Sequence, residues 1–309
     1  MLLLSNADLE GLLDMPTAVA LTEETLRQQA DGKVIAHEPL VLRTSAQDVR
    51  INLGSLVVPQ VAAVRAASRG GATLLFDTEA NRLMAVMAYP GGNLRVGATV
   101  GLAVDRMARA DAEQLTMIGT GTVARSCIEG IAACRQFRRV LVYSRDPQHR
   151  ADFCAYARDF GVEAESVPDP EPAIRTADVV VLATWASAPV LHHAWLKPDA
   201  HVTTAGIRLE VDDDTYLKAS LVAVTSKEHE LRYRSNRTTD NVLLRLANSG
   251  ALPWDSIHEL AEIVAERTRV PPGITLFRES QGGYGDVPLI HYLYRRAFEL
   301  GRGQEWDID

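Results

Sequence analysis

Residues 115–124 read Leu115-Thr-Met-Ile-Gly-Thr-Gly-Thr-Val-Ala124. The apolar run 115–118 predicts a strand, and the spacing of apolar residues after Ala124 predicts a helix over 122–134. Between them stands G-x-G-x-x-A, a turn that lets the backbone approach a pyrophosphate and packs helix on strand. The start of the helix offers free N–H groups to phosphate. We therefore expect a dinucleotide site, formed by Gly119, Thr120, Gly121, Thr122, Val123 and Ala124.

The chain after Asp111 alternates apolar runs with helical spacing, which predicts a parallel, doubly wound sheet. Expected strands are 115–118, 140–143, 162–167, 179–183, 201–204 and 221–225, and expected helices are 122–134, 147–160, 255–268 and 286–300. Before Asp111, residues 5–31 and 97–109 have helical patterns. Residues 34–87 contain short β-like runs at 57–58, 72–76 and 83–87.

This change of pattern predicts an α/β protein with two domains. Residues 112–286 are expected to form a Rossmann dinucleotide-binding domain. Residues 1–111 and 287–309 are expected to form a discontinuous α+β domain for substrate binding and dimerisation, because the last helix should pack back on the first domain.

Composition excludes several classes of function. The chain has 309 residues and a formal net charge of −8, which argues against a nucleic-acid binder. It has no apolar run near the ~20 residues of a membrane span and no signal peptide, so we expect a cytoplasmic protein. Its three cysteines lack metal-ligand spacing and its histidines do not cluster, so we expect no metal site.

Lysine is scarce: 28 of the 32 basic residues are arginine, and no lysine lies between Lys33 and Lys197. Arginine stays protonated, with a pKa above about 12. Chemistry that needs a titratable amine is therefore excluded between those two lysines.

The second strand of the nucleotide fold predicts which cofactor binds. An NAD site carries Asp or Glu at this strand end to accept from the ribose 2′-hydroxyl. Here the strand ends in Ser144-Arg145, with Arg150 close behind and Asp146 one place late. A hydroxyl and guanidinium groups suit a 2′-phosphate. We therefore favour NADP(H) over NAD(H), while solvated loop arginines remain the alternative.

The chain resembles the ornithine cyclodeaminase/mu-crystallin family over nearly its whole length. The motifs that carry the resemblance are loose singly and specific in their order: Leu94-Arg-Val-Gly-Ala98, Met107-Ala-Arg109, Met117-Ile-Gly-Thr-Gly121, Asp178-Val-Val-Val-Leu-Ala-Thr184, Pro189-Val190, Ile274-Thr-Leu-Phe277, Ser280-Gln-Gly282, Asp286 and Tyr294. The resemblance implies a homodimer whose β-rich substrate domain, built from both chain ends, flanks a Rossmann domain.

The resemblance also implies basic groups that hold a substrate carboxylate during hydride exchange at the α-carbon. Arg95 matches one family arginine and Arg43 resembles another, although a surface charge is the plainer interpretation of Arg43. Arg65 stands where the family has a lysine. Ser68 and Ser280 match family positions near the cofactor. Thr184, at the end of a strand, is expected to line the cofactor crevice outside the carboxyl ends of the sheet, and Gly206 belongs to the same site.

This chain departs from the family after the strand 201–204. The family continues with Gly-x-Asp, whose aspartate acts on the amine that leaves in cyclodeamination; this chain has Ala205-Gly-Ile-Arg-Leu-Glu210. Arg208 takes the place of the aspartate and cannot act as a base. Glu210 or one of Asp212–Asp214 can substitute for the aspartate if the loop refolds, but we expect this acidic run to lie in a solvated loop. The extra arginine suggests a substrate with a second acidic group.

These observations favour an NAD(P)H-dependent oxidoreductase that transfers hydride at the α-carbon of a small imino or amino acid carrying a carboxylate. Two alternatives remain. A redox-neutral cyclodeaminase would release ammonia, and a cofactor-bound binding protein would turn nothing over.

Overall fold

The computed structural model describes residues 1–37, 40–42, 49–66, 71–89, 91–206, 209–232, 241–280 and 283–307. The chain divides into two compact units. Unit 1 comprises Met1–Arg95 and Gln281–Asp309, and unit 2 comprises Val96–Ser280. The domain limits expected from the sequence, 1–111 with 287–309 and 112–286, stay a prediction. None of the described helices is long and apolar enough to cross a membrane.

Unit 2 contains a sheet in which every pairing of the described strands is parallel. Its order is β10-β9-β8-β11-β12-β15-β13-β14. The strands are β8 (Gln114–Ile118), β9 (Arg139–Tyr143), β10 (Glu163–Ser166), β11 (Val179–Leu182), β12 (His201–Thr204), β13 (Leu221–Val224), β14 (Ile257–Glu259) and β15 (Thr275–Arg278). The strand order reverses between β8 and β11, where doubly wound sheets bind their ligands.

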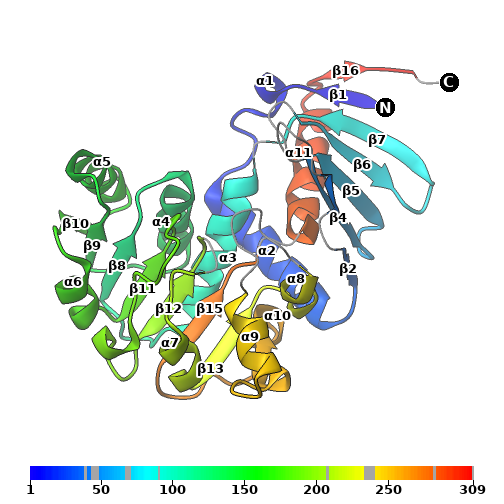
Figure 1. Cartoon of the computed structure of the whole chain (residues 1–309). Helices are drawn as coiled ribbons and strands as arrows, with labels where there is room; N and C mark the ends of the chain where they lie inside the picture. The colour runs from blue at the N-terminus through cyan, green and yellow to red at the C-terminus, as the bar shows by residue number, and fades with distance from the viewer. Residues whose placement is uncertain are drawn as a thin grey trace. The chain divides into compact units, whose positions relative to one another are not determined.

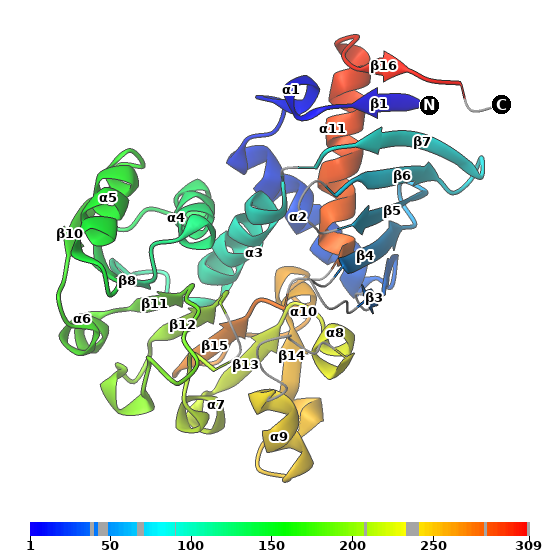
Figure 2. The same cartoon turned by 45° about the horizontal axis from the view of Figure 1, so that its top comes forward.

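Helices cover both faces of this sheet (Figure 2). They are α3 (Gly92–Met107), α4 (Thr122–Cys134), α5 (Pro147–Arg158), α6 (Pro170–Thr176), α7 (Asp213–Lys218), α8 (Lys227–Arg232), α9 (Val242–Asn248) and α10 (Leu260–Val264), with 3₁₀ turns η1 (His193–Trp195) and η2 (Trp254–Ser256). Alternate residues of β11 enter two cores. Val179 and Val181 pack with α3, α4 and α5, and Val180 and Leu182 pack with α6, α7 and α9.

The predicted doubly wound sheet is therefore confirmed, and helix α4 has its predicted bounds. The predicted helix over 255–268 is wrong. There the chain forms η2, then β14, which pairs with β13, and only then the short helix α10. Pairing with a neighbouring strand overrides local helical spacing at these residues.

Unit 1 is built on a mixed sheet in the order β16-β1-β7-β6-β5-β4-β2, with β3 also paired to β4. Its strands are β1 (Leu2–Leu4), β2 (Val34–Ala36), β3 (Leu40–Leu42), β4 (Val49–Leu56), β5 (Val61–Ala66), β6 (Thr73–Asp77), β7 (Arg82–Met87) and β16 (Gln304–Glu305). Val57 and Val58, expected in a strand, lie instead in the exposed turn between β4 and β5. Pro59, which has no N–H for a ladder, follows them.

The helices of unit 1 come from both parts of the chain. They are α1 (Asn6–Leu9), α2 (Met15–Ala30) and α11 (Val287–Glu299), with the 3₁₀ turn η3 (Gly283–Asp286) before α11. Helix α11 contacts α2, β4 and β5, and Figure 1 shows it across the sheet. Because α11 buries Leu289, Ile290 and Leu293 there, the C-terminal segment belongs to the core of unit 1.

Candidate functional site

The turn after β8 has the backbone that its sequence predicts. Gly119 has φ +109°, and a Cβ atom there would lie 2.4 Å from the carbonyl oxygen of Ala183. Its N–H donates to the carbonyl oxygen of Tyr143 at 2.8 Å. Ala124 is fully buried in the core between α4 and the sheet. Only glycine fits position 119. There the chain that leaves β8 lies against the end of β9, at Tyr143, and the residue that follows β11, Ala183.

The N-terminus of α4 is open. Gly121 is its N-cap, no side chain of the described residues caps it, and Gly121 and Thr122 are exposed. A Cβ atom at Gly121 would have no heavy atom within 4 Å. The uncapped N–H groups of the first turn carry partial positive charge. These features fit the pyrophosphate of a dinucleotide, with Thr120 and Val123 on either side of the exposed pair.

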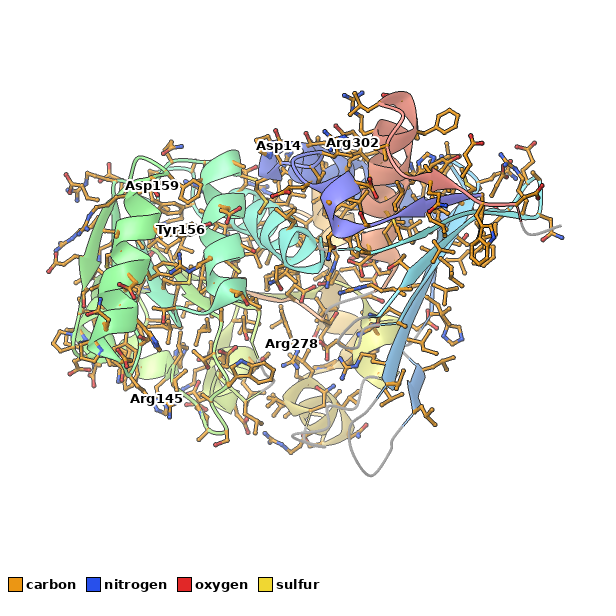
Figure 3. The ribbon with its side chains drawn as sticks, turned by 90° about the horizontal axis from the view of Figure 1, so that it is seen from above. Asp14, Arg145, Tyr156, Asp159, Arg278 and Arg302 are labelled. Atoms are coloured by element: carbon orange, nitrogen blue, oxygen red, sulfur yellow. The ribbon has the colours of Figure 1, made fainter. Side chains whose placement is uncertain are left out.

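The three residues that predict the cofactor follow β9, Ser144 and Arg145 in the loop and Arg150 in the first turns of α5. Arg150 donates to the carbonyl oxygen of Ser144 at 2.6 Å and to Ser166 Oγ at 3.0 Å. Arg145 is exposed, and within the described ranges it makes no hydrogen bond or ion pair (Figure 3). Asp146 caps α5, and the hydrogen bond from the His149 backbone lowers the pKa of its carboxyl group. Asp146 is thus engaged with its helix, whereas Arg145 can meet an anion.

A buried carboxylate ties together the ends of β11 and β12. Glu210 Oε1 accepts from the backbone N–H and hydroxyl of Thr184, each at 2.6 Å. Its Oε2 accepts from the hydroxyl of Thr204 at 2.6 Å and from the N–H of Gly206 at 3.1 Å. Burial raises the pKa of Glu210, and the donated hydrogen bonds oppose that rise. A Cβ atom at Gly206 would lie 2.4 Å from this carboxylate.

The expectation of a solvated loop is therefore wrong for Glu210, whereas Asp214 is exposed as expected. Glu210 is 1% exposed, and its backbone carbonyl accepts from Val190 and Leu191. Asp212 caps helix α7, whose first turn contains Asp213 and Asp214. Four donated hydrogen bonds at two strand ends offset part of the cost of burying the carboxylate, and a buried polar group is tolerated when it is hydrogen-bonded.

Ser280 follows β15 at the same edge of the sheet and is 5% exposed. Its N–H donates to Thr225 Oγ1 at 3.2 Å. Its own Oγ is buried and lacks a hydrogen-bond partner in the part of the chain that the structure describes. A buried hydroxyl without a partner is costly, so this atom fits a polar group of a bound ligand. Gly119, Thr184, Gly206 and Ser280 all follow carboxyl ends of parallel strands.

Unit 1 brings two of the predicted arginines together. Arg65 Nη1 lies 3.1 Å from Asp286 Oδ2, and Arg95 Nε lies 3.2 Å from Asp286 Oδ1. The hydroxyl of Tyr89 donates to Asp286 Oδ1 at 3.1 Å. The guanidinium of Arg65 also lies 5.2 Å from the centre of the Tyr89 ring. We call Arg65, Tyr89, Arg95 and Asp286 the arginine cluster. Arg43, Ser68 and Arg208 lie outside the described residues.

Comparison with known proteins assigns the family. Residues 61–265 match the model of the ornithine cyclodeaminase/mu-crystallin family. The chain belongs to this family. It is 31% identical over 261 residues to a Δ1-pyrroline-2-carboxylate reductase of Bacillus cereus, covering 81% of this chain and 78% of the relative.

Solved structures of the family share the fold. A Δ1-pyrroline-2-carboxylate reductase of Thermococcus litoralis, in complex with NADH and L-proline, superposes with a TM-score of 0.87 and 25% identity over 99% of this chain and 100% of that chain. The iminosuccinate reductase of Paracoccus denitrificans, in complex with NAD⁺, has a TM-score of 0.90 and 19% identity over 100% and 99% of the two chains. The predicted resemblance is thus confirmed.

The sequence does not predict three residues of the arginine cluster and of the Glu210 hydrogen-bond network, namely Asp286, Tyr89 and Glu210. In the sequence Asp286 stands only as part of a family motif, and no local pattern indicates Tyr89 or the structural role of Glu210. A signal existed for Glu210: Thr184 and Thr204 both stand where strands end, and two hydroxyls at one edge can serve a common acceptor. Asp286 is 191 residues from Arg95, so only the folded chain reveals their contact.

Proposed function

We propose that this chain reduces the C=N bond of a small imino acid at the expense of NADPH. It is an NAD(P)H-dependent oxidoreductase of its family. The observation that carries the proposal is the open, uncapped N-terminus of α4 behind the Gly119 turn. NADPH bound at this turn would supply hydride for the imine carbon, and with one proton taken up by the imine nitrogen the products would be an amino acid and NADP⁺.

Two sets of residues have distinct tasks in this proposal. Gly119–Ala124 bind the pyrophosphate, while Thr184, Gly206 and Ser280 line the nicotinamide half, and we assign Ser68 to the same half from the family resemblance. Arg65 and Arg95 hold the substrate carboxylate with charge-assisted hydrogen bonds, and we assign Arg43 to this group by the same resemblance. Glu210 fixes Thr184 and Gly206 in place.

The preference for NADPH over NADH is part of the proposal. It is supported by the exposed guanidinium of Arg145 beside Ser144 and by the engagement of Asp146 as a helix cap. A planar guanidinium binds a phosphate monoester through two parallel hydrogen bonds, which a ribose hydroxyl cannot accept with the same strength.

The substrate class that we propose is a cyclic imine carboxylate. Relatives that carry the name Δ1-pyrroline-2-carboxylate reductase support it, and the arginine cluster supports the carboxylate. Arg208, in place of the family aspartate, leaves no base there for the release of ammonia, which argues against cyclodeamination. A second acidic group on the substrate remains the expectation attached to Arg208.

We also propose that the protein is a homodimer, which the described face of the unit 1 sheet supports. Strand pairing places Ile35, Leu40, Leu42, Val49, Ile51, Leu53, Val64, Leu74, Phe76, Leu83 and Val86 on one face. Each is exposed or half-exposed. Large contiguous apolar surfaces of this kind mark protein interfaces.

The test of the function compares the purified protein with its Gly121→Ala variant. NADPH oxidation is followed over a panel of cyclic imine carboxylates, and NADPH affinity is measured by fluorescence. The methyl group of the variant meets no protein atom within 4 Å, so the melting temperature should stay unchanged. The methyl stands where the pyrophosphate approaches, so NADPH affinity should fall at least tenfold.

Three outcomes contradict the proposal. Ammonia release from ornithine or lysine would identify a cyclodeaminase. Tight NADPH binding without turnover on any imine would identify a binding protein. Equal NADPH affinity of the Gly121→Ala variant and the natural protein would remove the assigned cofactor site.

A further inference from the structure

Asp286 has an unusual position for its contacts. It immediately precedes α11 as the N-cap residue, where an aspartate ordinarily accepts from the N–H groups of the first helical turn. Its side chain makes no such capping bond. Both carboxylate oxygens instead contact Arg65, Arg95 and Tyr89. Helix α11 therefore lacks a side-chain cap, which would stabilise it by about 1 kcal/mol. The carboxylate binds the arginines and the tyrosine of the arginine cluster instead.

The backbone around Asp286 leaves it little freedom. A Cβ atom at Gly54 of β4 would lie 2.4 Å from the Cα of Tyr284. A Cβ atom at Gly283 would lie 2.9 Å from the carbonyl oxygen of Leu53, and one at Gly285 would lie 2.8 Å from Arg95 Cδ. Turn η3 therefore packs flush against β4 and Arg95. The side chain of Asp286 is 3% exposed.

The two arginines meet the carboxylate differently. The side chain of Arg95 is 6% exposed, and that of Arg65 is 25% exposed. Arg65 uses one of its five N–H donors in the hydrogen bond to Asp286. Its other donors have no acceptor within the described ranges. Burial raises the pKa of Tyr89, so its hydroxyl keeps its proton and donates to Asp286.

Charge explains why a carboxylate is needed here. Two guanidinium groups at one acceptor repel each other, and the repulsion is stronger in a buried site than in water. Asp286 balances the charge of one of them and accepts one N–H from each. Arg65 then keeps its remaining N–H donors for a second carboxylate.

We propose that Asp286 is a positioning residue, which orients the guanidinium groups of Arg65 and Arg95 for the substrate carboxylate. The inference rests on the proposed function, in which these arginines bind that carboxylate. Asp286 acts through them, without touching the substrate. Its removal should weaken the binding of substrate and of transition state equally, because the carboxylate is bound in both.

The test is the Asp286→Asn variant, which keeps the shape of the side chain and removes its charge. KM for the imino acid should rise at least tenfold, with kcat within about threefold of the natural protein. A carboxamide analogue of the substrate lacks the charge that the arginines bind, so its KM should hardly change. Asp286→Glu, which restores the charge one methylene away, should recover part of the loss and serves if the Asn variant folds poorly.

Asp178→Asn is the matched control. Asp178 is also buried and also lies between two cations, 2.8 Å from Arg109 and 2.8 Å from Lys197, at the amino end of β11. This variant should lower the melting temperature and leave KM unchanged. A merely structural role for Asp286 would produce the same pattern, and that result would overturn the proposal.

Crystal structures of the natural protein and the Asp286→Asn variant separate this inference from the proposed function. The inference requires the guanidinium of Arg65 or Arg95 to change orientation in the variant, whether or not the substrate is correctly identified. Unchanged guanidinium groups, or a lower KM in the variant, would refute it. A natural protein that reduces no imino acid would refute the proposed function, and the inference would then stand or fall on the guanidinium positions.

Discussion

At the scale of single residues, the proposed preference for NADPH rests on Arg145. It is exposed beside Ser144, so Arg145→Ala should fold normally. Loss of a bidentate phosphate contact should weaken NADPH binding about tenfold, since charge-assisted hydrogen bonds are worth ~1.5–3 kcal/mol. NADH binding should change less than twofold. Titration of both nucleotides checks this, and Arg138→Ala, which alters another exposed arginine of unit 2, is the control. Equal losses for both nucleotides would contradict the proposed preference.

His201 makes stability depend on pH. Burial lowers the pKa of His201 to about 3, and its ring nitrogens pair with Thr275 and Thr203, each at 2.8 Å. The unfolded chain therefore binds one more proton than the folded chain between about pH 6.5 and 3. The part of the free energy of unfolding that comes from keeping His201 neutral is therefore complete above pH 6.5. It falls by about 1.4 kcal/mol per pH unit as the pH drops from 6.5 toward 3.

Urea unfolding of the natural protein and of His201→Gln between pH 7 and pH 4.5 measures this effect. The variant cannot take up the proton, so its free energy of unfolding should fall less steeply, by up to one proton's worth of slope. Identical slopes would show that His201 does not account for the acid sensitivity.

Residue identities revealed only part of the candidate site. The glycines of the turn could be predicted, because a positive φ and a close backbone approach each require glycine. Glu210 and Asp286 could not, because an acidic residue in a loop sequence looks the same whether water or a set of buried donors surrounds it. Glu210 pairs with Thr184, and Asp286 pairs with Arg65 and Arg95. These residues are distant in the sequence and become neighbours only in the folded chain.

At the scale of elements, α3 and α4 cross at glycines. A Cβ atom at Gly130 would lie 1.9 Å from the carbonyl oxygen of Gly97, and one at Gly101 would lie 2.2 Å from that of Gly130. Such an approach lets the helix that follows the nucleotide turn pack tightly in the core. In an exposed helix, Gly→Ala would add about 1 kcal/mol of stability.

Gly130→Ala should therefore do the reverse and destabilise the protein by about 3 kcal/mol or more, because the methyl overlaps backbone. The melting temperature and NADPH affinity should both fall. Ala133→Gly, at an exposed position of the same helix, should cost only about 1 kcal/mol. If the Gly130→Ala variant were as stable as the natural protein, α3 and α4 could move apart at little cost in free energy, and the prediction would be wrong.

Elements differed in how well the sequence predicted them. Strong local signals placed α4 and β12 with their predicted bounds. The segment 255–268 misled, because Ile257–Glu259 gains more from pairing with β13 than from its helical spacing. Short helices such as α6 and α9 carry too few turns for periodicity to stand out.

At the scale of the whole molecule, the apolar face of the unit 1 sheet predicts self-association. Leu42, Ile35 and Leu40 are 64%, 61% and 48% exposed. The opposite face carries buried residues such as Leu56, Leu75 and Met87. A sheet that is apolar on both faces requires cover on both.

Light scattering of the natural protein should give about twice the chain mass of 33.8 kDa. The double variant Ile35→Lys with Leu42→Lys should give the mass of a single chain, because charges are costly in a buried interface. Leu217→Lys changes an exposed leucine on α7 and should stay dimeric. A natural protein that remains monomeric at 50 µM would contradict the proposed homodimer.

The C-terminal origin of Asp286 has a consequence for synthesis. Unit 2 is one uninterrupted run, while unit 1 needs the segment that follows it. A ribosome adds about 5–20 residues per second, and domains fold as units while they emerge. The last strand of unit 2 to be made, β15, lies between β12 and β13, so unit 2 is complete only six residues before Asp286. Arg65 and Arg95 leave the ribosome long before either, so throughout most of synthesis these two guanidinium groups have no counter-charge from Asp286.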